Sequence, residues 1–259
     1  MRKIIFIALL SIISVHAFTQ NKKEKRAARA EKINALIKQE EEGILVFKKH
    51  FIYGGGLATD GYGIFAEKGI KQDKRKTTLY RIELYEKKHV KEERLNLQAN
   101  SFGATNTVIQ YKLNNFFQLK LGYGMQYLIG GKGNKNGVEV TAVGVGGITM
   151  GLLKPYYLNV QDSRGVRTQV TYDTPDTTQY FLIGASGLSK GINETKIRPG
   201  IFTKTGLRFD YGKYNEMVNS IEVGICTEFY TNKIPQMFLL KQRNLFLSLY
   251  VSVLLGRRK

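Results

Sequence analysis

Few residues of this chain could carry acid–base or nucleophilic chemistry. Of its three histidines, only His50 and His89 lie beyond the N-terminal segment, and neither belongs to a metal-binding spacing such as HExxH. Each lies near the end of a predicted strand, so we expect both at surface or interfacial positions. His89 is followed by Glu92 and Glu93, and an acid–base pair would form there if a serine came close.

No serine or cysteine is marked as a nucleophile. Ser186 lacks a GxSxG elbow and is better explained as a small residue where a strand gives way to a loop. The single cysteine, Cys226, excludes an internal disulfide, a CxxC pair and a zinc site of several cysteines. The glycine-rich stretches at 54–56, 131–133 and 144–147 lack phosphate-loop spacing, which favours bends or bulges. We therefore predict no catalytic, metal or cofactor residues, no cofactor and no enzyme activity, and ligand-binding residues stay open.

The N-terminal residues 1–19 have the layout of a signal peptide. Arg2 and Lys3 precede an apolar run from Ile4 to Val15, and Ala17 suits a cleavage site. The run is shorter than the roughly 20 residues that a membrane-spanning helix requires. Later apolar stretches are only strand-sized, so the mature chain can cross a membrane only as a β-barrel, which satisfies its own backbone hydrogen bonds.

Residues 20–43 form a charged leader that is typical of a marginal helix or a disordered segment. A flexible leader, a periplasmic tether and a barrel plug are all compatible with this composition. The formal charge of the whole chain is +19, which favours anionic partners such as outer-membrane lipid and lipopolysaccharide. Export disfavours nucleic acid as a partner.

From residue 44 to residue 259 the chain has the period-two alternation of strands with two different faces, and we predict one all-β domain there. Strand signals lie near residues 50–69, 76–89, 104–113, 116–131, 137–160, 166–186, 199–211, 217–230 and 243–256. In the first of these, Gly54 to Gly56 and Asp60-Gly61 suggest a bulge or an extra turn. Because bacterial barrels prefer even strand numbers, we predict an antiparallel transmembrane β-barrel of about 8–10 strands.

Alternation alone does not say which face lies inside. The export signal favours a membrane barrel, and Tyr123, Tyr127 and the run Lys154 to Tyr157 could join the interfacial aromatic girdles. In that orientation charged residues of both signs point into the lumen: Arg81, Glu83, Lys120, Lys204, Arg208, Asp210, Glu222 and Glu228. A barrel of about eight strands is nearly filled by side chains, so we expect a packed, hydrogen-bonded network there.

Three basic connections, Lys71–Lys76, Lys132–Lys135 and Arg164–Arg167, could bind lipopolysaccharide phosphates if they are extracellular. They could equally be solvated turns, because the sequence leaves the side of the membrane open for each of them.

Three segments, Gly146–Tyr157, Arg198–Gly206 and Asn244–Gly256, resemble parts of small uncharacterised outer-membrane barrels of Bacteroidota. The resemblance covers roughly residues 44–259 and implies a fold and a location in the bacterial outer membrane, without catalytic residues. One departure is the basic tail Gly256-Arg257-Arg258-Lys259, where barrel strands often end on an aromatic residue.

The sequence thus predicts an outer-membrane barrel with a largely filled lumen and a structural, adhesion or envelope-assembly role, with other envelope proteins among its partners. The alternatives are a narrow transport pore, a barrel enzyme that modifies lipid, and a secreted soluble barrel that binds an apolar ligand.

Overall fold

The computed structural model describes residues 27, 28, 30, 31, 35, 47–97, 106–132, 137–173, 180–187, 189–212, 217–238 and 240–259. The signal peptide predicted for residues 1–19 lies outside this part of the chain. Of the leader predicted for residues 20–43, only five residues are described, and all five are helical. Within the described residues, no helix is both long enough and apolar enough to span a membrane.

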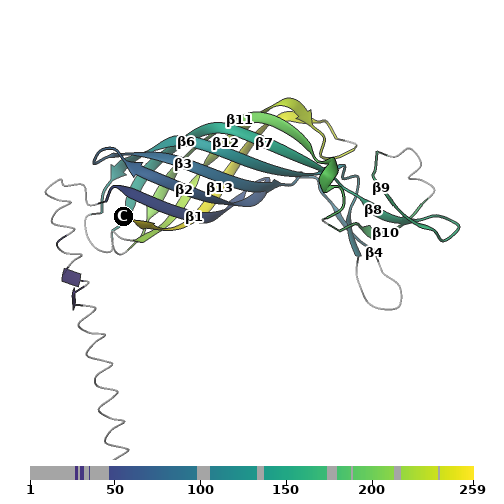
Figure 1. Ribbon diagram of the computed structural model, residues 1–259, viewed down its shortest axis with the longest axis horizontal. Helices are drawn as coiled ribbons and strands as arrows, with labels where there is room; N and C mark the ends of the chain where they lie inside the picture. The colour runs from purple at the N-terminus through teal and green to yellow at the C-terminus, as the bar shows by residue number, and fades with distance from the viewer. Residues whose placement is uncertain are drawn as a thin grey trace, which may run out of the picture.

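Eight antiparallel strands close into a barrel in which each strand pairs with its neighbours along the chain and the last strand pairs with the first (Figure 1). These strands are β1 (Lys49–Ala58), β2 (Gly61–Lys71), β3 (Lys76–Lys87), β6 (Asn114–Gly130), β7 (Glu139–Pro155), β11 (Lys196–Asp210), β12 (Met217–Ile234) and β13 (Arg243–Arg258). Closure leaves no free sheet edge among them. The prediction of an antiparallel barrel is confirmed.

The two ends of the barrel differ. The β2–β3, β6–β7 and β11–β12 connections lie at the same end as the C-terminus, which we call the terminal end (Figure 1). The opposite end carries two small sheets, one of β4 (Arg94–Leu97) with β5 (Asn106–Ile109) and one of β8 (Leu158–Gln161) with β9 (Arg167–Val170) and β10 (Phe181–Ala185). We call these five strands the outer platform. A short 3-10 helix, η2 (Ile192–Glu194), follows them.

The outer platform has a hydrophobic core of its own. Its buried members come from β5, from β8 and β9, and from the start of the β7–β8 connection: Val108, Tyr156, Leu158, Val160 and Val170. Tyr156 donates its backbone N–H to the carbonyl of Leu113 and accepts a hydrogen bond from the N–H of Ile109 at its hydroxyl, at 2.8 and 3.1 Å. The connections at this end therefore fold into a packed structure.

The strand count follows from one confirmed suggestion and one correction. The extra turn suggested within the signal at 50–69 is present at Asp60-Gly61, so this signal contains two strands. The signals at 104–113 and 166–186 belong to the outer platform and add no barrel strand. No bulge occurs at Gly54 to Gly56, where β1 keeps an unbroken register with both of its neighbours.

The inward-facing glycines of β1 make room for large interior side chains. A Cβ added at Gly54 would collide with the carbonyl oxygen of Val253 and lie 2.7 Å from the Phe65 ring, and one at Gly56 would collide with the Tyr85 hydroxyl. Steric fit inside the barrel therefore explains these two glycines, and of the two alternatives from the sequence the bulge is absent.

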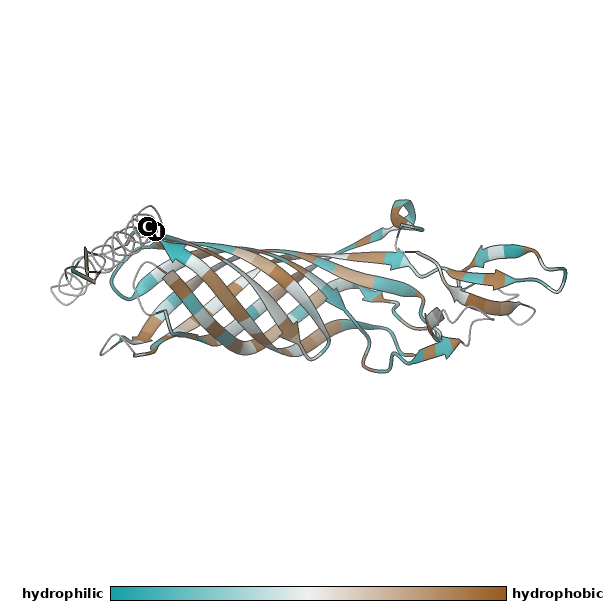
Figure 2. Cartoon of the chain, turned by 90° about the horizontal axis from the view of Figure 1, so that it is seen from below, coloured by the Kyte–Doolittle hydropathy of each residue, from teal (hydrophilic) through white to brown (hydrophobic). Residues whose placement is uncertain are grey.

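The faces of the barrel strands agree with the predicted orientation. Hydrophobic and hydrophilic residues alternate along them (Figure 2), and the outward side chains are apolar. On the outer face of β6, Tyr123, Met125 and Ile129 are 56–60% exposed. On the inner face of the same strand, Gln118 and Lys120 are at most 3% exposed. The charges lie inside and the apolar belt lies outside, which is the arrangement of a membrane barrel and excludes a soluble one.

Candidate functional site

The centre of the lumen holds six charged side chains, which we call the inner cluster. Its members are three carboxylates and three cations: Glu67, Glu83, Glu222, Arg81, Lys204 and Arg208. Arg81 binds both carboxylate oxygens of Glu222, with each contact at 2.9 Å. Arg208 joins the same carboxylate at 2.7 Å and Glu67 at 2.8 Å. All six side chains are at most 2% exposed, and their formal charges cancel.

Aromatic side chains complete the inner cluster. The Tyr250 hydroxyl donates a hydrogen bond to Glu222 at 3.0 Å. The ammonium group of Lys204 lies 4.1 Å from the centre of the Tyr250 ring and 2.8 Å from Glu83. Cation–π contact and ion pairing together hold the lysine in place where water is largely excluded.

A second neutral group, the outer cluster, lies toward the platform end. Glu228 forms ion pairs with Lys120 at 2.6 Å and with Lys87 at 3.0 Å, and Lys87 also pairs with Asp60. Gln118 donates a further hydrogen bond to Glu228 at 2.6 Å. Two carboxylates therefore face two ammonium groups, so no member is left as an uncompensated buried charge.

An aromatic cluster occupies the lumen at the platform end. The rings of Phe116, Tyr230 and Phe246 lie 5.5–5.9 Å apart in edge-on or tilted contacts. Phe116 and Tyr230 are at most 1% exposed. Offset and edge-on contacts of this kind are favourable, and the rings replace water across this part of the barrel.

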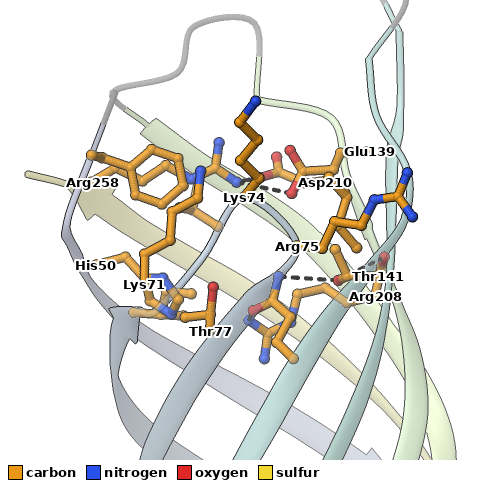
Figure 3. Close-up of a pocket in the computed structure, with 15 residues that line it drawn as sticks. His50, Lys71, Lys74, Arg75, Thr77, Glu139, Thr141, Arg208, Asp210 and Arg258 are labelled. Carbon is orange, nitrogen blue, oxygen red and sulfur yellow. Dashed lines mark hydrogen bonds and ion pairs between the residues drawn. The ribbon is translucent and has the colours of Figure 1, made fainter. Parts of the chain in front are cut away.

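The lumen opens into a small pocket at the terminal end (Figure 3). Its wall combines the basic side chains Lys71, Lys74, Arg75 and Arg258 with the acidic Glu139 and Asp210, together with interior residues below them. Arg258 binds Asp210 at 2.7 Å. The cavity measures only about 30 Å³, which is room for one or two water molecules and no larger solute.

The structure confirms the inward position of every charged residue that the sequence predicted there: Arg81, Glu83, Lys120, Lys204, Arg208, Asp210, Glu222 and Glu228 are all buried. Lys87, which the alternation of its strand places on the same face as Arg81 and Glu83, is buried as well. Sequence reasoning missed Glu67. Glu67 is followed by the exposed Lys68, so charges stand on both faces at that point and blur the alternation. The signal that identifies Glu67 as an inward residue is the register of β2 against β3, in which Glu67 stands opposite Arg81.

The structure separates the residues considered for chemistry. His50 is buried in the lumen, 3.4 Å from Glu67, so the expected surface or interfacial position is wrong for it. A Cβ at Gly69 would collide with the His50 ring, so the glycine leaves the space that the ring occupies. Cys226 is also buried, beside Lys120 and Glu228.

His89 lies near the start of the β3–β4 connection, half-buried, and its backbone N–H binds Glu92 at 3.1 Å. Burial lowers the pKa of His89, and the nearby Glu92 opposes this shift. Its Nδ1 accepts the backbone N–H of Lys91. Ser186 follows the end of β10, as predicted, and its hydroxyl accepts a hydrogen bond from Gln169. Within the described residues, no three His, Cys, Asp or Glu side chains are placed to hold a metal ion.

The aromatic residues predicted for the girdles divide into two groups. Tyr123 and Tyr127 are exposed on the outer face of β6, as predicted. Tyr156 is instead buried in the platform core, and burial raises its pKa. The hydrogen bond from Tyr157 to Glu194, at 2.6 Å, ties the platform to η2 and raises the pKa of Tyr157.

The basic connections also lie on different sides. Lys71–Lys76 and the start of Lys132–Lys135 are at the terminal end, whereas Arg164–Arg167 forms the β8–β9 turn of the outer platform. Only the last of the three therefore lies on the platform side.

A closed eight-stranded barrel with an apolar exterior and a charged, hydrogen-bonded interior defines a transmembrane β-barrel. No family model matches the chain, and no curated protein matches its sequence. Among solved structures it is similar to Ail, the attachment invasion locus protein of Yersinia pestis, at 8% identity and a TM-score of 0.41, over 82% of this chain and 99% of that chain. It is also similar to Neisserial surface protein A (NspA), at 10% identity and a TM-score of 0.40, over 82% and 97% of the two chains. The resemblance to barrels of Bacteroidota stays a prediction.

Proposed function

We propose that this chain is a non-enzymatic protein of the bacterial outer membrane whose barrel anchors the outer platform and displays it at the cell surface. The observation that carries the proposal is the filled lumen. The two neutral clusters and the aromatic cluster fill the lumen with paired or closely packed side chains, and the adjoining cavities measure only about 30 and 10 Å³. The barrel then serves as an anchor, and binding falls to the surface outside it.

The arrangement of the two ends supports this role. Outer-membrane barrels have short periplasmic turns and longer extracellular loops. Here the end opposite the C-terminus carries the platform with its own buried core. A surface built on packed strands holds its shape for a partner, which suits adhesion or envelope assembly.

Fractionation and conductance test the proposal. We expect the protein in the outer-membrane fraction, with a gel mobility in detergent that shifts on boiling because the closed barrel resists unfolding. In planar bilayers we expect no stepwise conductance at neutral pH, because the paired side chains leave no continuous water path. Protein recovered from the soluble periplasm would refute the location, and reproducible conductance steps would favour the narrow pore instead.

A further inference from the structure

The lipid-facing side of the barrel is hollowed near the platform end. The hollow is an apolar groove of about 480 Å³ that crosses β1, β2, β3 and β6. Its walls are formed by large outward side chains: Leu57, Tyr62, Ile64, Leu84 and Phe117. The floor is backbone of β1 and β2.

The groove exists because an outward position is occupied by glycine. Gly55 lies between Val253 of β13 and Ile64 of β2 in the register, and both partners are hydrophobic and exposed. A Cβ added at Gly55 would meet only the carbonyl oxygen of Gly63, at an ordinary 3.7 Å. A side chain would fit there, so the hollow is not forced by crowding.

The rim of the groove at the platform side is polar and basic. The Tyr62 hydroxyl donates a hydrogen bond to Glu86 at 2.6 Å, and the Lys88 ammonium group lies 4.7 Å from the centre of the Tyr62 ring. Arg94 lies within electrostatic reach of the same hydroxyl. Two cations thus lie near Tyr62, whose hydroxyl donates to one carboxylate, and the three charged groups of the rim sum to +1.

We propose that this groove binds an acyl chain of a phosphorylated, multiply acylated glycolipid of the lipid A class, with Lys88 and Arg94 at its phosphate. The apolar hollow suits the chain, and the basic rim at the headgroup level complements the phosphate. This inference rests on the proposed function, because that function places the platform end in the outer leaflet, where such glycolipids lie.

Two matched glycine substitutions test the groove. Gly55→Leu fills the hollow, whereas Gly144→Leu adds the same side chain to the outer face of β7, where a Cβ meets nothing within 4 Å. Purified protein in neutral detergent micelles is mixed with lipid A, and the bound fraction is measured by native mass spectrometry. We expect Gly55→Leu to weaken binding about tenfold, as for the loss of about two buried methylene groups, and Gly144→Leu to match the wild type.

The rim is tested with the double variant Lys88→Gln/Arg94→Gln. We expect about thirtyfold weakening for lipid A, because the variant removes two basic residues and each contributes about 1 kcal/mol near a membrane surface. The inference is overturned if Gly55→Leu binds lipid A as well as Gly144→Leu does, or if phosphatidylglycerol binds the wild type equally tightly. The boiling shift and membrane fraction of the same samples report the proposed function separately, so its failure is distinguishable.

Discussion

At the scale of single residues, the interior charges are strongly interdependent. Glu222 accepts hydrogen bonds from Arg81, Arg208 and Tyr250 at 2.7–3.0 Å. Together with Glu67, which contacts the same two side chains, its carboxylate neutralises two guanidinium groups that water does not reach. Removal of one partner from such a buried group costs far more than the net contribution of the intact network, because an uncompensated charge stays behind.

We therefore expect Glu222→Gln to destabilise the barrel by about 3–5 kcal/mol. The measurement is the urea dependence of unfolding in detergent micelles, followed by circular dichroism. Glu93→Gln is the control, because Glu93 is exposed outside the barrel, and we expect it to stay within about 0.5 kcal/mol of the wild type. Equal stability of the two variants would contradict a tightly coupled inner cluster.

At the scale of elements, the outer platform packs around a core of its own and is attached to the barrel by β3, β6, β7 and β11. Its core combines strands from two separate connections, since Val108 of β5 packs with Leu158 and Val160 of β8. The barrel and the platform share no hydrophobic cluster among the described residues. Loss of platform packing should therefore leave the barrel closed.

Tyr156→Ala tests this separation. Tyr156 fills the platform core, and its truncation should cost the platform about 3–5 kcal/mol through a cavity and a lost hydrogen bond. We expect proteases to cut the platform connections of this variant rapidly while its boiling shift stays unchanged. Tyr157→Ala, whose ring lies at the surface beside Glu194, should remain protease-resistant. Loss of the boiling shift in Tyr156→Ala would show that platform and barrel fold as one.

At the scale of the whole molecule, the single buried cysteine makes the orientation directly measurable. Cys226 is 4% exposed inside the lumen, so the folded wild type should not react with a bulky maleimide. Arg164→Cys places a thiol on the platform turn, where the Arg164 side chain is 87% exposed. Lys74→Cys places one on the exposed β2–β3 turn at the terminal end.

With the platform outside the cell, a membrane-impermeant maleimide should label Arg164→Cys on intact cells. Lys74→Cys should react only after the outer membrane is permeabilised, because its turn faces the periplasm. Denatured wild type supplies the positive control through Cys226. The opposite labelling pattern would refute the proposed orientation, and labelling of both variants on intact cells would show a barrel that is not properly inserted.

The sequence by itself determined the two faces of the strands. Side chains on a strand alternate with period two, so Lys120 and Arg208 had to face away from the apolar belt whichever strands were their partners. The same local rule placed Cys226 with the charges. A chain that enters lipid must satisfy its own backbone hydrogen bonds, which requires a closed barrel, and its polar strand faces must then point inward.

Only the tertiary structure decided what depends on pairing between distant segments. The sequence signals at 104–113 and 166–186 have the same local pattern as barrel strands, yet they pair within the platform. The inner cluster unites Glu67 with Arg208, 141 positions apart, and Phe116 meets Tyr230 and Phe246 only after closure. Alternation fixes the direction of each side chain, whereas register and closure choose its neighbours, and that choice is non-local.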